Sequence, residues 1–156
     1  MDKNAIKKYA VWARRELIER VSQKALQYGI TADGKADPNA DSVNGRLLSD
    51  AEKKQRQALI RKVNEQGYEM VMEEVAYTWF NRLIAVRFME VNDYLPSHIR
   101  VLSSDSGKME PDLVTTPFDA ELYFTRDEEQ LVYQLKQENK IDELFRILFI
   151  KQCNAL

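Results

Sequence analysis

Four charged residues interrupt the most apolar stretch of the sequence, "TWFNRLIAVRFMEVNDYLP" (78–96). They are Arg82, Arg87, Glu90 and Asp93. At about 100° per residue, Arg87 and Glu90 fall inside the apolar arc of a helix, whereas Arg82 and Asp93 flank it. A buried charge must be paired, and two residues three apart on a helix can pair on one face.

Two interpretations of Arg87 and Glu90 remain open. In the structural one, they form an internal ion pair or a hydrogen-bonding hub that ties the end of the helix to the loop at 96–117. In the functional one, they line a polar pocket for a ligand or for another domain. We expect the structural role first, because buried pairs of this kind are more often architectural than catalytic.

An aspartate-rich segment resembles the start of a calcium-binding loop. Asp37, Asn39 and Asp41 match the first three ligand positions of an EF-hand. Ser42 stands where the turn glycine belongs, however, and Leu48 stands where the bidentate glutamate belongs. Partial matches of this kind are common in aspartate-rich turns, so the segment is not predicted to bind calcium.

Nucleophilic and cofactor chemistry also lacks the necessary residues. His98 is the only histidine and Cys153 the only cysteine, which excludes an intramolecular disulfide, a histidine pair and a paired thiolate metal site. Neither residue has a convincing catalytic partner, and no GxGxxG, Walker A or GxSxG pattern occurs. We therefore predict no catalytic, cofactor-binding or metal-binding residue in this chain.

Composition is that of an ordinary soluble domain. The chain has 156 residues, of which 44% are hydrophobic and 31% charged, so we expect one helical domain over 1–156. The net charge of −2 gives no global reason to bind nucleic acid, which would need a local basic patch. The sequence has no signal-peptide core and no run of about 18 uncharged apolar residues, so we expect a cytoplasmic protein without a membrane partner.

Apolar spacing predicts the elements that position these residues. Capping-box patterns, Ser-x-x-Glu and Thr-x-x-Glu, indicate two of the helix starts. The third helix is apolar over most of its circumference and should be buried among the others. The expected fold is mainly α, a bundle of about five helices around a central buried helix, with a loop or small β-hairpin at about 97–117. The expected helices are about 3–28, 49–66, 68–94, 125–138 and from 141 on, and the long loops are 29–48 and 96–124.

The apolar stretch also identifies a family. The blocks "EEVAYTWFNRLIAVRFMEVNDYLP", "RVLSS" and "EPDLVT" resemble the N-terminal region of the PglX adenine-specific DNA methyltransferases of BREX phage-defence systems. The blocks "NAIKKYAVWARRELIERV", "GIT" and "LFIKQCNAL" look like the same family. The resemblance covers nearly the whole chain, and its long block is far more specific than any short motif.

The resemblance implies a parent enzyme whose active site lies elsewhere. Such methyltransferases use S-adenosylmethionine to methylate the exocyclic amine of adenine, and their defence systems resemble restriction-modification systems. Their tetrapeptide of the N-P-P-Y type holds the flipped base. Neither that tetrapeptide nor a glycine-rich S-adenosylmethionine loop occurs here, so we expect an N-terminal fragment and transfer no catalytic residue onto it.

The resemblance also suggests partners. We expect the helical domain to pack against the methyltransferase's own downstream catalytic domain and to help shape a DNA channel. Arg14, Arg15 and Arg20 on the first helix are the candidate DNA contacts, because phosphate binding needs only local lysine or arginine density. Two alternatives are a module that docks other defence-system proteins and a purely structural brace, which would expose a large apolar patch.

Overall fold

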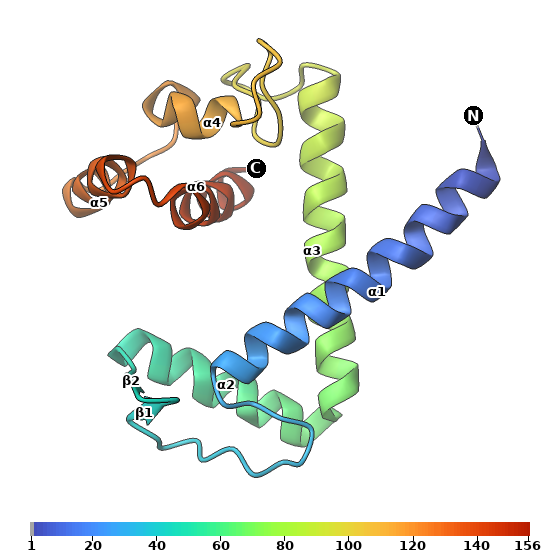
Figure 1. The fold of residues 1–156 in the computed structure, drawn as a ribbon, viewed down its shortest axis with the longest axis vertical. Coiled ribbons are helices and arrows are strands. Elements are labelled where there is room, and N and C mark those ends of the chain that lie inside the picture. Colours follow the sequence, from blue (N-terminus) through green and yellow to red (C-terminus); the bar gives the residue numbers. More distant parts are fainter. Residues whose placement is uncertain (1) are drawn as a thin grey trace. The chain divides into compact units, whose positions relative to one another are not determined.

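The structure, a computed structural model that describes residues 2–156, is mainly α-helical, and the predicted fold class is confirmed (Figure 1). No helix in this described part is long and apolar enough to cross a membrane. The long helices are α1 (Lys3–Gln27), α2 (Asp50–Gln66), α3 (Tyr68–Val91), α5 (Arg126–Gln137) and α6 (Ile141–Ala155). Two single turns complete the helical content, α4 (Asp112–Thr115) and the 3-10 helix η1 (Pro117–Ala120).

Both predicted capping boxes form. The Ser49 hydroxyl accepts a hydrogen bond from the Glu52 amide at 3.2 Å, and the Glu52 carboxylate accepts one from the Ser49 amide at 2.9 Å. Thr125 and Glu128 make the same reciprocal pair at 3.3 and 2.8 Å. Each pair satisfies two backbone amides that the first turn of a helix leaves without a partner, which is why α2 and α5 begin at these points.

A small hairpin forms within the segment 29–48, which the sequence indicated as loop. Its strands, β1 (Ser42–Val43) and β2 (Arg46–Leu47), pair antiparallel. The turn between them is Asn44-Gly45, with φ angles of 51° and 78°. Asn-Gly tolerates two successive positive φ angles and so favours the tight turn that joins two strands. The other candidate hairpin, at about 97–117, is a loop that leads into α4.

The chain divides into two compact units, one up to Asn81 and one from Arg82 on, so the boundary lies inside α3. In the first unit, the end of α1, α2 and the start of α3 share one hydrophobic core. Its buried members are Ala25, Ile30, Ile60, Val63, Val71 and Met72. The expectation of a single helical domain over 1–156 stays a prediction.

The second unit has its own buried residues. Helix α6 packs against α4 and α5, and the loop after α3 covers part of the same core. The fully or nearly fully buried side chains are Val101, Leu113, Val114, Val132, Leu135, Leu144, Leu148 and Phe149. Most come from apolar positions three or four apart, as expected for helices that bury one face.

Helix α3 is buried along one side only. Val71, Met72, Ala76 and Val86 are buried, and the helix ends at Val91 rather than at about 94. Exposed apolar side chains occupy other sides of the helix. They are Met70, Tyr77, Ile84, Phe88 and Val91. We expected this helix, apolar over most of its circumference, to be buried among the others, and the exposed side chains correct that expectation, because burial depends on how much surface the neighbouring elements cover.

Candidate functional site

The carboxylate of Glu90 is the most completely bonded charged group in the second unit. Its Oε2 accepts hydrogen bonds from the backbone amides of Val101 and Leu102, both at 2.8 Å. Its Oε1 accepts from the Ser103 hydroxyl at 3.1 Å and from the guanidinium of Arg87. The side chain is 0% exposed, so the end of α3 and the following loop are joined through one buried anion.

Burial alone raises the pKa of Glu90, because it disfavours the charged form. The Leu102 amide, the Arg87 guanidinium, the Val101 amide and the Ser103 hydroxyl all stabilise the carboxylate and together hold its pKa below the usual value. Glu90 is therefore an anion at neutral pH with every lone-pair direction in use. Such a group cannot accept a further proton or ligand without breaking the loop connection, which favours the structural interpretation of the pair.

The three arginines of α1 do not gather into one site. Arg14 pairs with Glu73 of α3, its Nε lying 3.1 Å from Oε1 of that carboxylate. Arg20 pairs with Glu16 one turn earlier on the same helix, at 2.8 Å. Arg15 forms no ion pair within the described part of the chain. At about 100° per residue, the three side chains leave the helix in three different directions.

An open apolar groove of about 210 Å³ lies beside the Arg14–Glu73 pair, where α1 crosses the first half of α3. Apart from that pair, the lining is apolar. The lining residues are Ala10, Arg14, Leu17, Glu73, Ala76, Tyr77 and Phe80. With no set of converging polar groups, this groove has room for an apolar side chain but nothing that could perform acid–base or nucleophilic chemistry.

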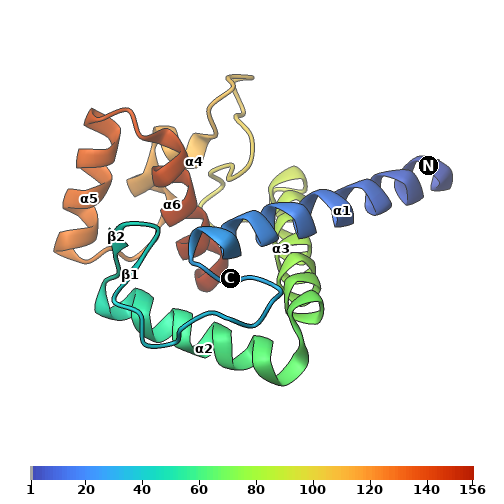
Figure 2. The ribbon, with the colours of Figure 1, turned by 60° about the horizontal axis from the view of Figure 1, so that its bottom comes forward.

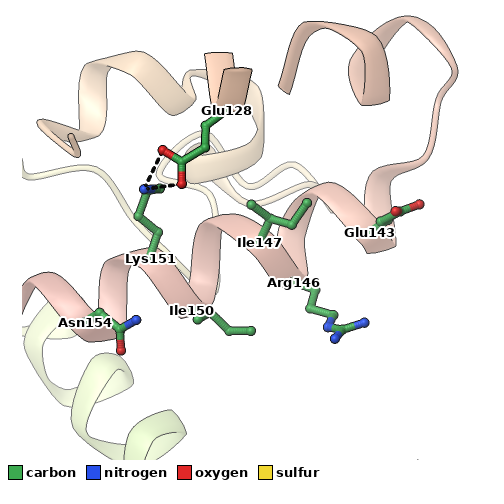
Figure 3. A pocket seen from close by; sticks show the side chains of 7 residues that line it. All are labelled: Glu128, Glu143, Arg146, Ile147, Ile150, Lys151 and Asn154. Atoms are coloured by element: carbon green, nitrogen blue, oxygen red, sulfur yellow. Dashed lines mark hydrogen bonds and ion pairs between the residues drawn. The ribbon is translucent and has the colours of Figure 1, made fainter. Parts of the chain in front are cut away.

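A second open groove, of about 470 Å³, runs along α6 beside the start of α5 (Figure 3). At its edge Lys151 pairs with both carboxylate oxygens of Glu128, at 2.9 and 3.0 Å, and donates to the Tyr123 carbonyl at 2.9 Å. The same Glu128 closes the capping box of α5, and its pKa is lowered first by the amide of that box and then by Lys151. The pair thus holds α6 to the start of α5, and the adjacent Arg146 and Ile147 converge on no reactive group.

Cys153 and His98, the residues with intrinsic reactivity, do not form a reactive site. Burial raises the pKa of the Cys153 thiol and so favours the unreactive, protonated form; the charge of Arg82 opposes this shift but is the smaller effect. His98 lies on the surface, with Nδ1 at 2.7 Å from Asp93. Within the described residues, no three His, Cys, Asp or Glu side chains gather in a way that could hold a metal ion.

A site for S-adenosylmethionine requires a particular local architecture. Nucleotide-type cofactors bind where a glycine-rich turn links a strand to the start of a helix. In the described part, the only strands form the two-residue hairpin, and all five glycines have positive φ angles in turns that join other kinds of element. These residues therefore do not fit that cofactor.

No known protein-family profile matches the sequence. The chain is similar over 100% of its length to two curated proteins. One is "Adenine-specific methyltransferase PglX" of Lacticaseibacillus casei strain Zhang, 38% identical over 178 residues, and the other is "Adenine-specific methyltransferase BrxX" of Escherichia coli O9:H4 strain HS, 34% identical over 168 residues. The chain spans only 15% and 14% of the length of these relatives.

Proposed function

Starting from this similarity to the N-terminal region of the PglX adenine-specific methyltransferases, we propose that the chain is a non-catalytic helical part of a longer enzyme. That enzyme uses S-adenosylmethionine to methylate N6 of adenine in DNA, as a cytoplasmic component of bacterial phage defence. The chain itself supports the catalytic core. Similarity over the whole of this chain to two adenine-specific methyltransferases supports this assignment.

The observation that carries the proposal is an exposed apolar face on the second half of α3. Ile84, Phe88 and Val91 are spaced four and three residues apart, so they line one side of the helix. Each is 45–60% exposed, and Tyr94 beyond the helix end continues the surface, its ring lying 5.8 Å from that of Phe88. Apolar side chains grouped in this way mark a surface that another protein surface covers. We call these four residues the α3 face.

The occupant we propose for the α3 face is the catalytic part of the same enzyme. The relatives are roughly seven times as long as the aligned segment, since that segment is 15% or 14% of them. A helix that buries one side within its own unit and presents the other to a neighbouring domain is a simple structural brace. Glu90, the buried charge at the end of α3, is already bonded to the following loop, so it is not available to a docking partner, whereas the apolar side chains of the α3 face are exposed.

Association between two separately produced pieces tests the proposal. The 156-residue chain is mixed with the rest of the parent protein, and complex formation is measured by analytical ultracentrifugation. We expect the Phe88→Glu/Val91→Glu double variant to lose the complex, because two carboxylates would be buried without partners. The matched control is Met109→Glu/Tyr123→Glu, which adds the same charge at two exposed positions of the same unit.

Plasmid adenine methylation by the full-length enzyme gives the functional readout, measured by mass spectrometry of the nucleosides. The α3-face double variant should methylate less than the control double variant. If the two double variants associate and methylate equally, the α3 face does not support the catalytic core.

The apolar groove between α1 and the first half of α3 favours a second candidate function, docking of another defence-system protein. Tyr77 lines this groove and is largely exposed. In a pull-down against purified components of the defence system, Tyr77→Glu should then lose a partner that the exposed-site control Leu47→Glu retains. Equal capture by both variants would remove this function.

A further inference from the structure

Positive charge in this chain is concentrated on α1. The helix carries seven lysines and arginines against two glutamates, whereas the whole chain has a net charge of −2. Between Lys3 and Arg15 there are five cations and no carboxylate. The rest of the chain is therefore clearly acidic, and α1 is a local basic patch of the kind that a polyanion requires.

One side of α1 carries an exposed group of cations with an aromatic ring. It consists of Lys7, Lys8, Val11, Trp12 and Arg15, which we call the basic face. All five side chains are exposed, and Trp12 is 58% exposed. In helical projection Lys8, Trp12 and Arg15 lie opposite Ala10 and Leu17, which line the groove with α3, whereas Lys7 lies nearer to that groove. Figures 1 and 2 show this end of the helix extending away from α2 and from the start of α3.

The cations of the basic face are not neutralised by the protein. Lys7, Lys8 and Arg15 form no ion pair or hydrogen bond with any side chain in the described part of the chain. Asp2, the acidic residue nearest the start of the helix, accepts the amide hydrogen bonds of Asn4 and Ala5 as the N-cap. These three charges are therefore fully available to an external anion.

The other cations of α1 differ in this respect. Arg14 and Arg20 are paired with carboxylates. Lys24 donates to the side chain of Gln27 at 3.1 Å and lies 5.6 Å from the ring centroid of Tyr28. Of the three arginines predicted to contact DNA, Arg15 therefore belongs to the basic face, whereas Arg14 and Arg20 have charges that are already compensated by carboxylates.

We propose that the basic face of α1 binds the phosphate backbone of duplex DNA. This rests on the proposed function only in naming DNA as the polyanion. From Lys7 to Arg15 the face spans about 12 Å of helix axis, which covers about three phosphates of one strand at 3.4 Å each. Lys7, Lys8 and Arg15 contact these phosphates, and the ring of Trp12 packs against the adjacent sugar.

The shape of the face favours a duplex over a single strand. Proteins that bind single strands enclose the chain in a basic groove and stack successive bases on aromatic rings. The basic face is a shallow, open surface on one side of a helix and contains one ring, Trp12. The neighbouring ring of Tyr9, whose centroid lies 5.8 Å from that of Trp12, is tilted by 39° to it, so the two rings do not form a parallel platform for successive bases. An exposed cationic helix matches a partner that itself supplies the groove, as duplex DNA does.

Fluorescence anisotropy of the 156-residue chain with a labelled duplex of about 20 base pairs, between 50 and 200 mM salt, tests the proposal. Lys8→Ala/Arg15→Ala should weaken binding about tenfold at low salt and reduce the slope of log affinity against log salt by about two. Trp12→Ala should weaken binding about fivefold with an unchanged slope, since it removes contact but no charge.

The matched control is Arg20→Ala/Lys24→Ala, which removes the same two charges from the same helix. It should keep the wild-type slope. The proposal is overturned if both double variants weaken binding equally, if the wild type does not bind duplex at 50 mM salt, or if a single strand of the same length binds more tightly. Association through the α3 face is unaffected by these variants, so failure here is distinguishable from failure of the proposed function.

Discussion

Arg87 and Glu90 form an ion pair across one turn of α3, yet their side chains are 51% and 0% exposed. The two partners therefore contribute unequally. Glu90 also accepts hydrogen bonds from the backbone amides of Val101 and Leu102, whereas Arg87 makes one further hydrogen bond within residues 2–156, to the Ser103 hydroxyl at 3.1 Å. The carboxylate holds the loop, and the guanidinium covers it from the solvent side.

Replacing Glu90 should therefore destabilise the second unit far more than replacing Arg87. Glu90→Gln puts an amide NH₂ group against two backbone donors, and we expect a loss of about 3 kcal/mol in the free energy of unfolding. Arg87→Ala removes a half-exposed partner and should lose at most about 1 kcal/mol. Urea unfolding gives both values, and hydrogen exchange at Val101 and Leu102 localises the effect. Equal losses would contradict the asymmetry.

Stability should also fall in acid because of Glu90. Its pKa is lowered in the folded state, so its contribution is fully present above the pKa of the unfolded chain and is lost as the pH falls through the folded value. The difference in unfolding free energy between wild type and Glu90→Gln should be constant from about pH 6 to 8 and shrink below about pH 4.5. Urea midpoints across this range measure it, and a difference that persists unchanged at pH 3 would argue against an ionised Glu90.

Local signals predicted much of the fold. Ser49 and Thr125 each precede a glutamate by three residues, and such capping boxes need only neighbouring residues to form. The Asn44-Gly45 turn was also visible in the sequence, but in a loop rich in glycine and aspartate it was not assigned to a hairpin. Periodicity identified the apolar side chains of α3 correctly and could not tell that Phe88 is exposed, because exposure depends on what other elements cover.

The candidate site was less predictable for the same reason. Arg20 and Glu16 are four residues apart on one helix, so their ion pair could be expected from spacing. Arg14 is paired with Glu73, 59 residues away, and only the packing of α1 on α3 brings them together. Which arginines remain available to an anion is therefore a property of tertiary structure.

His98 should report directly on its contact with Asp93. The hydrogen bond that His98 donates to the Asp93 carboxylate and then the charge of that carboxylate raise the pKa of His98, since both favour the imidazolium. As the only histidine, His98 gives a single imidazole titration in the NMR spectrum. The Asp93→Asn variant should titrate at a lower pH than wild type, whereas Asp105→Asn, an exposed control in the following loop, should not. Any stabilisation from this pair is present below the unfolded pKa and disappears as the pH rises through the folded one.

Arg56 is a charged residue on an apolar side of its helix, four residues before Ile60 and seven before Val63. That spacing places it on the buried side of α2. The residue is 5% exposed, and its Nε donates to the Tyr28 carbonyl at 2.7 Å, while Nη1 donates to the Asp37 carbonyl. One guanidinium thus satisfies a carbonyl at the start and a carbonyl in the middle of the loop that follows α1.

Removing these donors should open that loop. In Arg56→Met the side chain keeps much of its apolar volume but leaves two part-buried carbonyls without partners, and we expect a loss of about 3 kcal/mol in unfolding free energy. The unfolding free energy of Arg56→Lys should lie between those of wild type and Arg56→Met, because a single ammonium cannot reproduce the planar guanidinium that reaches both carbonyls. Urea unfolding measures the loss, and faster proteolytic cleavage between 28 and 41 locates it.

The matched control for this prediction is Arg61→Met, which makes the same chemical change at an exposed position of α2. It should unfold within about 0.5 kcal/mol of wild type, as is usual for surface substitutions. If Arg56→Met is as stable as Arg61→Met and its loop resists cleavage equally well, the two carbonyls do not depend on Arg56. The loop would then be held by the left-handed turn at Gly29, where a Cβ atom would lie 3.0 Å from Val43, and Gly29→Ala would be the more damaging change.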